Sequence, residues 1–312
     1  MRRLTALAIA AIVLAGCGGA TTLTDPYQIV DKSASATYDV VQVNIGLNAT
    51  GSGTPVTIDP KSIQIIADHK AGKAEFKVSL PLAQLGADAA ALAQLGITSG
   101  NLDLDIVFDG QAVYAKGAVL TTVLTMLLTQ AGLTPGDLSG WLRLGTKDEF
   151  QALAGQIAPS ALPSMVPAAS HDAASIKKAL EDVGITLTYA GAEKRANKDT
   201  AHLTVAVDTA KLASSPAFGA VPSSQATTLK TGLQQLGIAA DAWIDSSTYR
   251  LVEVDLHLTP KDGSTGKVDV TILVSQPTDT SGLAAPSPYT AVPLSQLVTQ
   301  LLKTFGQGLI SQ

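Results

Sequence analysis

The stretch VEVDLHL, residues 252–258, alternates apolar and polar side chains without a break. Valine and leucine occupy its even positions, and Glu253, Asp255 and His257 occupy its odd ones. A period of two places neighbouring side chains on opposite faces of an extended chain, as in a strand with one buried and one wet face. The stretch therefore predicts a strand of an antiparallel sheet.

Three further stretches share this alternation: AEFKVSL (74–80), LDLDIVF (102–108) and KVDVTILV (267–274). Asp109 and Gly110 separate two apolar runs, and an Asp-Gly pair in that position is a strong hairpin signal. The turn residues at 245–247 separate two more runs in a less specific way. We therefore expect a sheet assembled largely from hairpins.

Segments with helical periodicity lie between these strands, at residues 88–95, 146–157, 170–184 and 293–306. The second segment begins with Thr146 and has Glu149 three residues later, which is a capping-box pattern. The last segment carries one apolar face, made of Leu294, Leu297, Val298, Leu301, Leu302 and Phe305. Strands and helices in this arrangement predict an α+β fold.

The chain carries signs of an internal duplication. KVSLPLAQL (77–85) resembles TVAVDTAKL (204–212), and each is followed by a helical segment, the phrase Gln-Leu-Gly-Ile (94–97 and 235–238) and a hairpin. Two copies of this module would build one long antiparallel sheet with helices on one side. The matched stretches are short, so chance similarity is the alternative.

The only cysteine is Cys17, at the end of the phrase LAGC (14–17). Arg2, Arg3, an apolar run of about 11 residues and two small residues precede it, which is the three-part layout of a secretory signal. The phrase resembles the bacterial lipoprotein signal, which implies cleavage before Cys17 and a diacylglyceryl group on its sulfur. Two acyl chains suffice for stable membrane anchoring. The alternative is an ordinary secretory signal with a chance cysteine.

We therefore expect three parts of the chain. Residues 1–16 would be a lipoprotein signal peptide, residues 17–30 the acylated cysteine with a flexible tether, and residues 31–312 one folded domain. The mature protein would be held at the cell membrane by its lipid, on the extracytoplasmic face.

Composition excludes several classes of protein. The net charge is −5 and the basic residues are dispersed, so no nucleic-acid surface is expected. Aromatic residues make up only 4% of a chain that is 46% hydrophobic, so the core must consist of aliphatic side chains. A single cysteine cannot form an internal disulfide, so packing must supply the stability.

No residue pattern of an enzyme is present. The sequence has no nucleophile elbow and no phosphate-binding loop, and no two of its four histidines have the spacing of a metal pair on a helix. His202 and His257 fall on the polar sides of expected strands, where solvated side chains are the ordinary case. We therefore expect neither catalysis, nor a metal site, nor a cofactor.

The stretch GAVLTTVLTMLLTQAG, residues 117–132, is apolar on nearly every side of the expected helix. Such a helix is either a central core element or the wall of a greasy cavity. In the second case its lining side chains would be Val119, Leu120, Val123, Leu124, Met126 and Leu127. The unbranched, adaptable side chain of methionine suits such a lining.

Several stretches together resemble a known family. After the lipoprotein cysteine come YDVVQVNIGLNATG (38–51), YAGAEKRANKDTAHLTVAVDTAKL (189–212), DAWIDSSTYRLVEVDLHL (241–258) and an ending from VDVTILVSQPTD (268–279) to VPLSQLVTQLL (292–302). This order is similar to the LppX/LprG-type lipoproteins of actinobacteria, within the LolA-like superfamily. The resemblance spans about residues 30 to 305 as diffuse strand patterns.

The resemblance implies a strongly bent antiparallel half-barrel with helices packed on its concave face. It also implies a lipoprotein that holds an acyl lipid or glycolipid between sheet and helices and transfers it across the cell envelope, with an envelope transporter as a possible partner. A regulatory module that binds a partner protein is the alternative, and an exposed apolar patch on the outer face would favour it. A hydrolase of unfamiliar type would need a titratable cluster that the sequence does not display.

Overall fold

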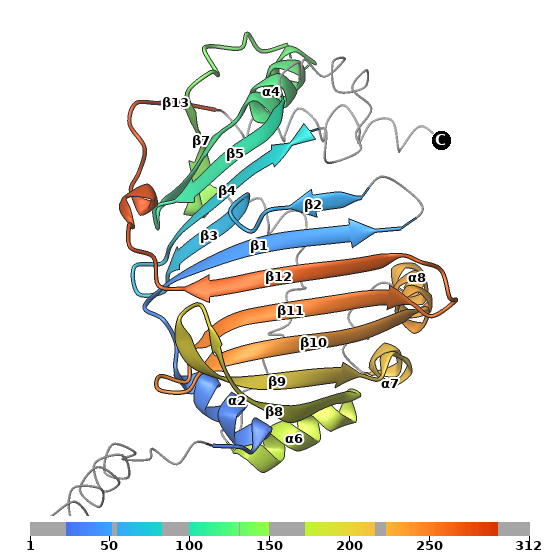
Figure 1. Ribbon diagram of the computed structural model, residues 1–312. Helices are drawn as coiled ribbons and strands as arrows, with labels where there is room; N and C mark the ends of the chain where they lie inside the picture. Colours follow the sequence, from blue (N-terminus) through green and yellow to red (C-terminus); the bar gives the residue numbers. More distant parts are fainter. Residues whose placement is uncertain are drawn as a thin grey trace, which may run out of the picture.

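The computed structural model describes residues 23–51, 55–82, 100–130, 132–149, 172–215 and 223–292. Within these residues one sheet of 13 strands dominates the molecule (Figure 1). Its strand order is β13-β7-β6-β5-β4-β3-β1-β12-β11-β10-β9-β8, and β2 pairs with β1 beside this path.

The strands are β1 (Val40–Thr50), β2 (Val56–Ile58), β3 (Ile63–Asp68), β4 (Lys73–Pro81), β5 (Asn101–Phe108), β6 (Ala112–Lys116), β7 (Trp141–Thr146), β8 (Ile185–Arg195), β9 (Lys198–Val207), β10 (Leu236–Asp245), β11 (Leu251–Pro260), β12 (Lys267–Ser275) and β13 (Tyr289–Ala291). The helices are α2 (Pro26–Ser35), α4 (Ala118–Gln130), α6 (Ala173–Asp182), α7 (Thr209–Ser214), α8 (Ser223–Gln234) and the short η3 (Ser281–Leu283).

The sheet is open. Its two ends, β13 with β7 and β8, do not pair with each other, and every strand pair described is antiparallel except β13 with β7. Helix α4 lies at one end of the sheet and α2 with α6 at the other, while α7 and α8 lie beside β10 (Figure 1). The predicted α+β fold is confirmed. The half-barrel that the resemblance implied is an open sheet, antiparallel except for the β13–β7 pair.

All four alternating stretches of the sequence are strands, within β4, β5, β11 and β12. The hairpin predicted at Asp109 and Gly110 joins β5 to β6. The Asp109 carboxylate accepts hydrogen bonds from the backbone amides of Gln111 and Ala112, and Gly110 takes a φ of 96°, which glycine adopts without a steric cost. The turn at Asp245 joins β10 to β11 in the same way. The Asp245 carboxylate accepts hydrogen bonds from the backbone amides of Ser247 and Thr248.

Two predicted helices are described at least in part. Residues 170–184 contain α6, which begins after the cap Asp172, whose carboxylate accepts from the Ser175 amide. The capping box at Thr146 and Glu149 is present, because each side chain accepts a hydrogen bond from the other residue's amide. The helices predicted at 88–95 and 293–306 lie outside the described residues.

The strand order repeats in the two halves of the sheet. β4, β5 and β6 are neighbours in one half, and β9, β10 and β11 are neighbours in the same sense in the other. These are the strands that hold the two matched sequence stretches and their hairpins. The repeated order is what the predicted duplication requires.

Part of the segment expected to be a tether is helical. Asp25 caps α2 by accepting from the Tyr27 amide, Pro26 occupies the first turn, and Ile29 is almost completely buried. Residues 26–30, which the expected tether of residues 17–30 included, are therefore helical, and the buried side chains of Tyr27 and Ile29 hold them against the fold.

Candidate functional site

One face of the sheet is apolar from end to end. Directly opposed residues on neighbouring strands share a face. On this basis Leu203 and Ala242, Val254 and Ile272, Ile45 and Ile272, Ile65 and Phe76, Ile106 and Ala115, and Ala115 and Leu142 line the same side. The apolar residues of all four alternating stretches therefore lie on one surface, which we call the apolar face.

Helices α2 and α4 cover opposite ends of the apolar face. Ile29 of α2 packs with Ala201, Leu203 and Ile244 near the edge strand β8. At the far end, α4 packs on β7 through a second set of buried residues, Leu124, Leu128, Leu138, Leu142 and Val292. The two helices therefore lie on the same side of the sheet, as the resemblance implied.

The centre of the apolar face is less deeply buried than its ends. Ile45, Leu47, Val254, Leu256 and Val270 are all half-buried, although each is a large aliphatic residue on the inner side of its strand. The main helix contacts of the described segments fall instead on β5, β6, β8 and β10. The central strands thus present an aliphatic surface that an apolar molecule could cover.

The six residues predicted to line a cavity do not share one environment in α4. Leu124 is buried in the cluster with Leu142, and Leu120 and Leu127 pack against that cluster. Val119 and Val123 are half-buried, while Met126 is 46% exposed. The stretch is a helix, as predicted, and packs one side onto the sheet.

Threonines interrupt α4 without leaving a polar group unpaired. The hydroxyls of Thr122, Thr125 and Thr129 donate to the carbonyl oxygens four residues earlier, and that of Thr121 donates to the Leu138 carbonyl. A hydroxyl that is bonded to its own helix needs no water. The outer side of α4 therefore combines Met126 with the methyl groups of internally bonded threonines.

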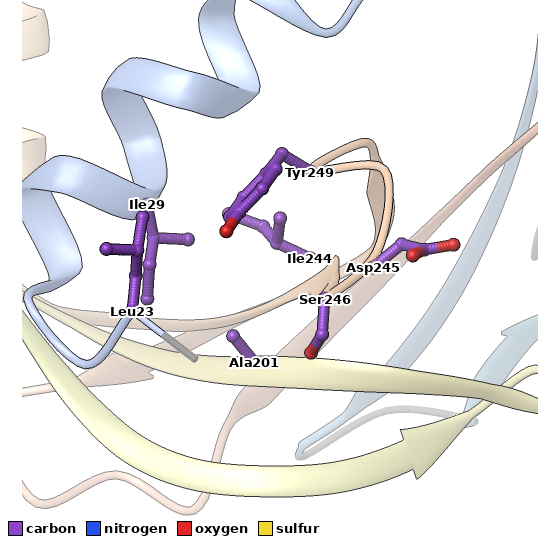
Figure 2. Close-up of a pocket in the computed structure, with 7 residues that line it drawn as sticks. All are labelled: Leu23, Ile29, Ala201, Ile244, Asp245, Ser246 and Tyr249. Carbon is purple, nitrogen blue, oxygen red and sulfur yellow. The ribbon is translucent and has the colours of Figure 1, made fainter. Parts of the chain in front are cut away.

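A small pocket lies between α2 and the turn from β10 to β11 (Figure 2). Leu23, Ile29, Ala201, Ile244 and Tyr249 make it mostly apolar, and Asp245 and Ser246 lie on its rim. Burial alone would raise the pKa of the Asp245 carboxyl. The hydrogen bonds from Ser247 and Thr248 outweigh it and hold that pKa below its usual value.

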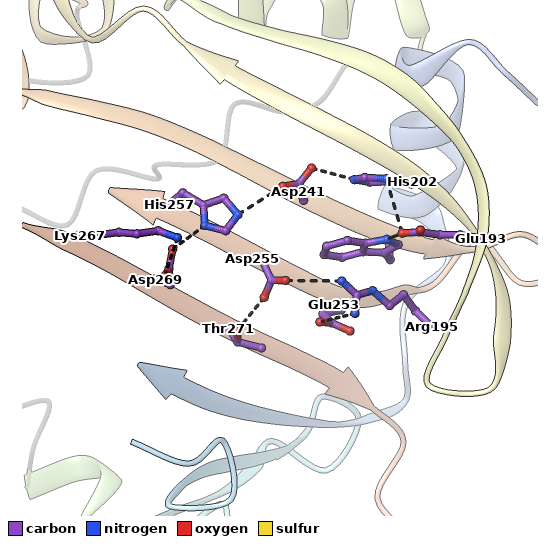
Figure 3. Close-up of polar contacts among 11 residues, drawn as sticks. Glu193, Arg195, His202, Asp241, Glu253, Asp255, His257, Lys267, Asp269 and Thr271 are labelled. Atoms are coloured by element: carbon purple, nitrogen blue, oxygen red, sulfur yellow. Dashed lines mark hydrogen bonds and ion pairs between the residues drawn. The ribbon is translucent and has the colours of Figure 1, made fainter. Parts of the chain in front are cut away.

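The opposite, polar face differs between the two halves. Over β4 and β5, the segment that leads from β12 to β13 packs η3 against the strands, and Leu283 is buried there. Over β9 to β12 the polar face carries a network of ionisable side chains instead (Figure 3). Its members are Glu193, Arg195, His202, Asp241, Glu253, Asp255, His257, Lys267 and Asp269.

The network joins residues that sequence reasoning treated as separate. His202 Nε2 lies 2.7 Å from Asp241 Oδ1, and His257 Nδ1 lies 2.7 Å from Asp269 Oδ1. Both histidines are on the polar face, as predicted, but neither is simply solvated. The cross-strand register brings them together, because His202 pairs with residue 243 on β10 and His257 with residue 239. Local alternation fixes the face and says nothing about that register.

Trp243 belongs to the same network. It is 3% exposed, its ring stacks on His202 with centroids 4.8 Å apart, and the Arg195 guanidinium lies 4.0 Å from its centroid. Its indole N–H donates to the Glu193 carboxylate. An aromatic ring beside a cation gains cation–π attraction. The indole therefore fixes the positions of three ionisable side chains.

Within the described segments, no group of three or more His, Cys, Asp or Glu side chains is arranged to hold a metal ion. Among the same residues, no helix has the length and apolar character to cross a membrane. Cys17 and the segments 1–16 and 17–22 lie outside the described residues, so the lipid attachment stays a prediction.

No family model matches the chain, and no curated protein matches it. Solved structures do. Lipoprotein LppX of Mycobacterium tuberculosis is 15% identical over 82% of this chain and 99% of its own, with a TM-score of 0.34. LprF of Mycobacterium bovis is 14% identical over 83% and 97%, with a TM-score of 0.36.

A LolA superfamily protein of Nitrosomonas europaea is 9% identical over 85% of this chain and 98% of its own, with a TM-score of 0.24. These matches belong to the groups that the sequence resemblance named. At such identities and TM-scores the likeness concerns the fold alone, so the function is argued from this chain's own residues.

Proposed function

We propose that this protein binds the acyl chains of a lipid or glycolipid against the apolar face and carries that lipid within the cell envelope, anchored through an acylated Cys17. The observation that carries the proposal is the half-buried aliphatic surface over the central strands. Each square ångström of apolar surface removed from water contributes about 25 cal/mol. Acyl chains are the natural partner of a surface made of Leu, Val and Ile side chains.

The proposal needs no catalytic group. Binding of hydrocarbon is non-directional, so it requires area and shape and not a fixed polar constellation. The polar face supports this assignment over partner sensing. In its described C-terminal half the polar face carries ion pairs, and an exposed apolar patch there would have favoured a partner-binding module.

The direct test uses a form that begins at Gly18, purified without detergent from a lipid-rich bacterial host. Its native mass is measured, and organic solvent then extracts any bound molecule for identification by mass spectrometry. We expect one acyl lipid per chain. A protein that carries no lipid and takes up none from vesicles would contradict the proposal and favour a partner-binding module.

Two neighbouring residues provide a matched pair of variants. Leu47 lies on the apolar face of β1, and Asn48 points to the polar face and is exposed. Because one buried methylene contributes about 0.8 kcal/mol, Leu47→Ser should weaken the uptake of a fluorescent fatty acid by about tenfold or more. Asn48→Ser should leave the uptake unchanged. Equal effects of the two changes would show that the apolar face is not the lipid site.

A further inference from the structure

His257 lies between two carboxylates from two different strands (Figure 3). Its Nδ1 is 2.7 Å from Asp269 Oδ1 on β12, and its Nε2 is 3.3 Å from Asp241 Oδ2 on β10. The histidine itself belongs to β11, the strand between them. One imidazole ring thus bridges three consecutive strands on the polar face.

The proton count of this ring decides what the bridge can do. A neutral imidazole has one N–H donor and one acceptor nitrogen, whereas an imidazolium has two donors. Ionised carboxylates only accept hydrogen bonds. With the ring neutral, one of its nitrogens would direct a lone pair at a carboxylate oxygen, so the contacts on both sides of His257 are satisfied together only when the ring is protonated.

The surroundings of the ring are rich in negative charge. The charged and titratable groups that share ion pairs over β8 to β12 on this face are Glu193 and Arg195 from β8, His202 from β9, Asp241 from β10, Glu253 and Asp255 from β11, and Lys267 and Asp269 from β12. Lys267 Nζ lies 3.0 Å from Asp269, and Arg195 lies 3.8 Å from Asp255. Five carboxylates therefore face two permanent cations, and a proton on His257 reduces this excess of negative charge.

The pKa directions agree with the geometry. The hydrogen bond to Asp269 raises the pKa of His257; burial works against it, and the charges of Asp269 and Asp241 add to the rise. For Asp269, burial alone would raise the pKa, but the hydrogen bonds from His257 and Lys267 outweigh it and lower that pKa. Both shifts thus favour a protonated His257 beside an ionised Asp269.

We propose that His257 is a proton-operated clasp that ties β10, β11 and β12 together on the polar face. The protonated ring donates to Asp241 and Asp269 at once, and the neutral ring keeps only one of these bonds. A histidine with a raised folded-state pKa contributes stability fully below its unfolded pKa, about 6.5, and loses that contribution as the pH rises through the folded pKa. The clasp is therefore closed in mildly acidic surroundings and loosened in alkaline ones.

This inference does not depend on lipid binding. It predicts that the C-terminal half of the sheet is held more tightly at about pH 5.5 than at about pH 8, which is the reverse of ordinary acid destabilisation. Carboxylates such as Asp269 with a lowered pKa limit the stable range on the acid side, because their contribution is lost as pH falls through their folded pKa.

The test is a nuclear magnetic resonance titration of the full chain with labelled histidine rings. The reference is the ordinary pKa of a histidine side chain, about 6.5. We expect the titration midpoint of His257 to lie clearly above this reference. Asp269→Asn should move the His257 midpoint down toward the reference, and Asp103→Asn, on β5 in the other half of the sheet, should leave it unchanged.

A second measurement follows stability without relying on the spectrum. The unfolding equilibrium constant of the wild type should rise several-fold from pH 6 to pH 8 relative to that of His257→Gln. His69→Gln, at an exposed residue of the turn between β3 and β4, is the control and should show the pH dependence of the wild type. A His257 midpoint at or below about 6.5 would overturn the clasp. So would equal pH dependence in the wild type and His257→Gln.

Discussion

Gly282 of η3 lies directly against the carboxylate of Glu75 on β4. An added Cβ at Gly282 would overlap that carboxyl group, and Glu75 is only 4% exposed. Lys77 Nζ, 2.7 Å away, neutralises the buried charge. The absence of a side chain at Gly282 therefore lets the segment between β12 and β13 pack closely on the first half of the sheet.

Gly282→Ala should accordingly lower the free energy of unfolding by about 1–3 kcal/mol, because the methyl group forces the η3 segment away from β4. Urea denaturation of the purified protein measures the loss. Gly140→Ala is the matched control, since nothing lies within 4 Å of the added Cβ there. An equal response at both glycines would show that the contact with Glu75 does not hold the segment.

Two variants of helix α4 distinguish a side chain that packs in the core from one that is exposed on the outer side of the helix. Leu124→Ala removes a side chain that is 5% exposed and should cost about 2–5 kcal/mol of unfolding free energy. Met126→Ala removes a half-exposed side chain and should change stability by about 0.5 kcal/mol or less. Thermal and urea unfolding measure both. A large loss at Met126 would mean that a further part of the chain packs on the outer side of α4.

Glu253 gives a pH-dependent prediction of its own. Burial raises the pKa of this carboxyl; Arg195 opposes the rise, and Asp255 and Glu193 add to it. Because the folded-state pKa is raised, ionisation costs stability at neutral pH, and the cost disappears as the pH falls below the unfolded pKa. Glu253→Gln should therefore stabilise the protein at pH 7 by up to about 1 kcal/mol, with no gain below about pH 4.

The control for this change is Glu181→Gln, which removes an exposed carboxylate 3.9 Å from Lys177. Exposed pairs of this kind contribute little, so the change should be within about 0.5 kcal/mol at either pH. Chemical denaturation at pH 4 and pH 7 gives all four values. A loss of stability in Glu253→Gln at pH 7 would show that the pair with Arg195 outweighs the burial of the charge.

The anchor is tested by Cys17→Ala. Without the sulfur no diacylglyceryl group can be attached, so the protein should leave the membrane fraction while its circular dichroism spectrum stays unchanged. Cell fractionation followed by a high-salt wash measures the distribution. A variant that remains with the membranes after this wash would contradict attachment through acyl chains.

Local sequence patterns predicted much of the fold. The alternation at 252–258 and in the three related stretches identified strands and the face to which each side chain turns, since a period of two is a property of the extended backbone itself. Asp109-Gly110 marked a hairpin for a similar reason, because the turn needs a positive φ and a short side-chain acceptor. The helix at 117–132 and the capping box at Thr146 and Glu149 were also visible.

These patterns did not predict which side chains of the candidate site are buried and which are exposed. The sequence indicated that Leu124 and Met126 share a helix, and only the packing on β7 separated the buried residue from the exposed one. The sequence did not indicate that residues 26–30, which were included in the expected tether, form the start of a helix. Its cause is a tertiary contact of Ile29 with strands far along the chain.

The sequence by itself determined the strands, their inner and outer faces and the aliphatic character of the core. Tertiary structure decided which strands are neighbours, and with them the bridge from Asp241 through His257 to Asp269. The reason is physical. Side-chain alternation is set within one strand, whereas register is set by hydrogen bonds and packing between strands, so residues 241, 257 and 269 meet only when β10, β11 and β12 pair in this register.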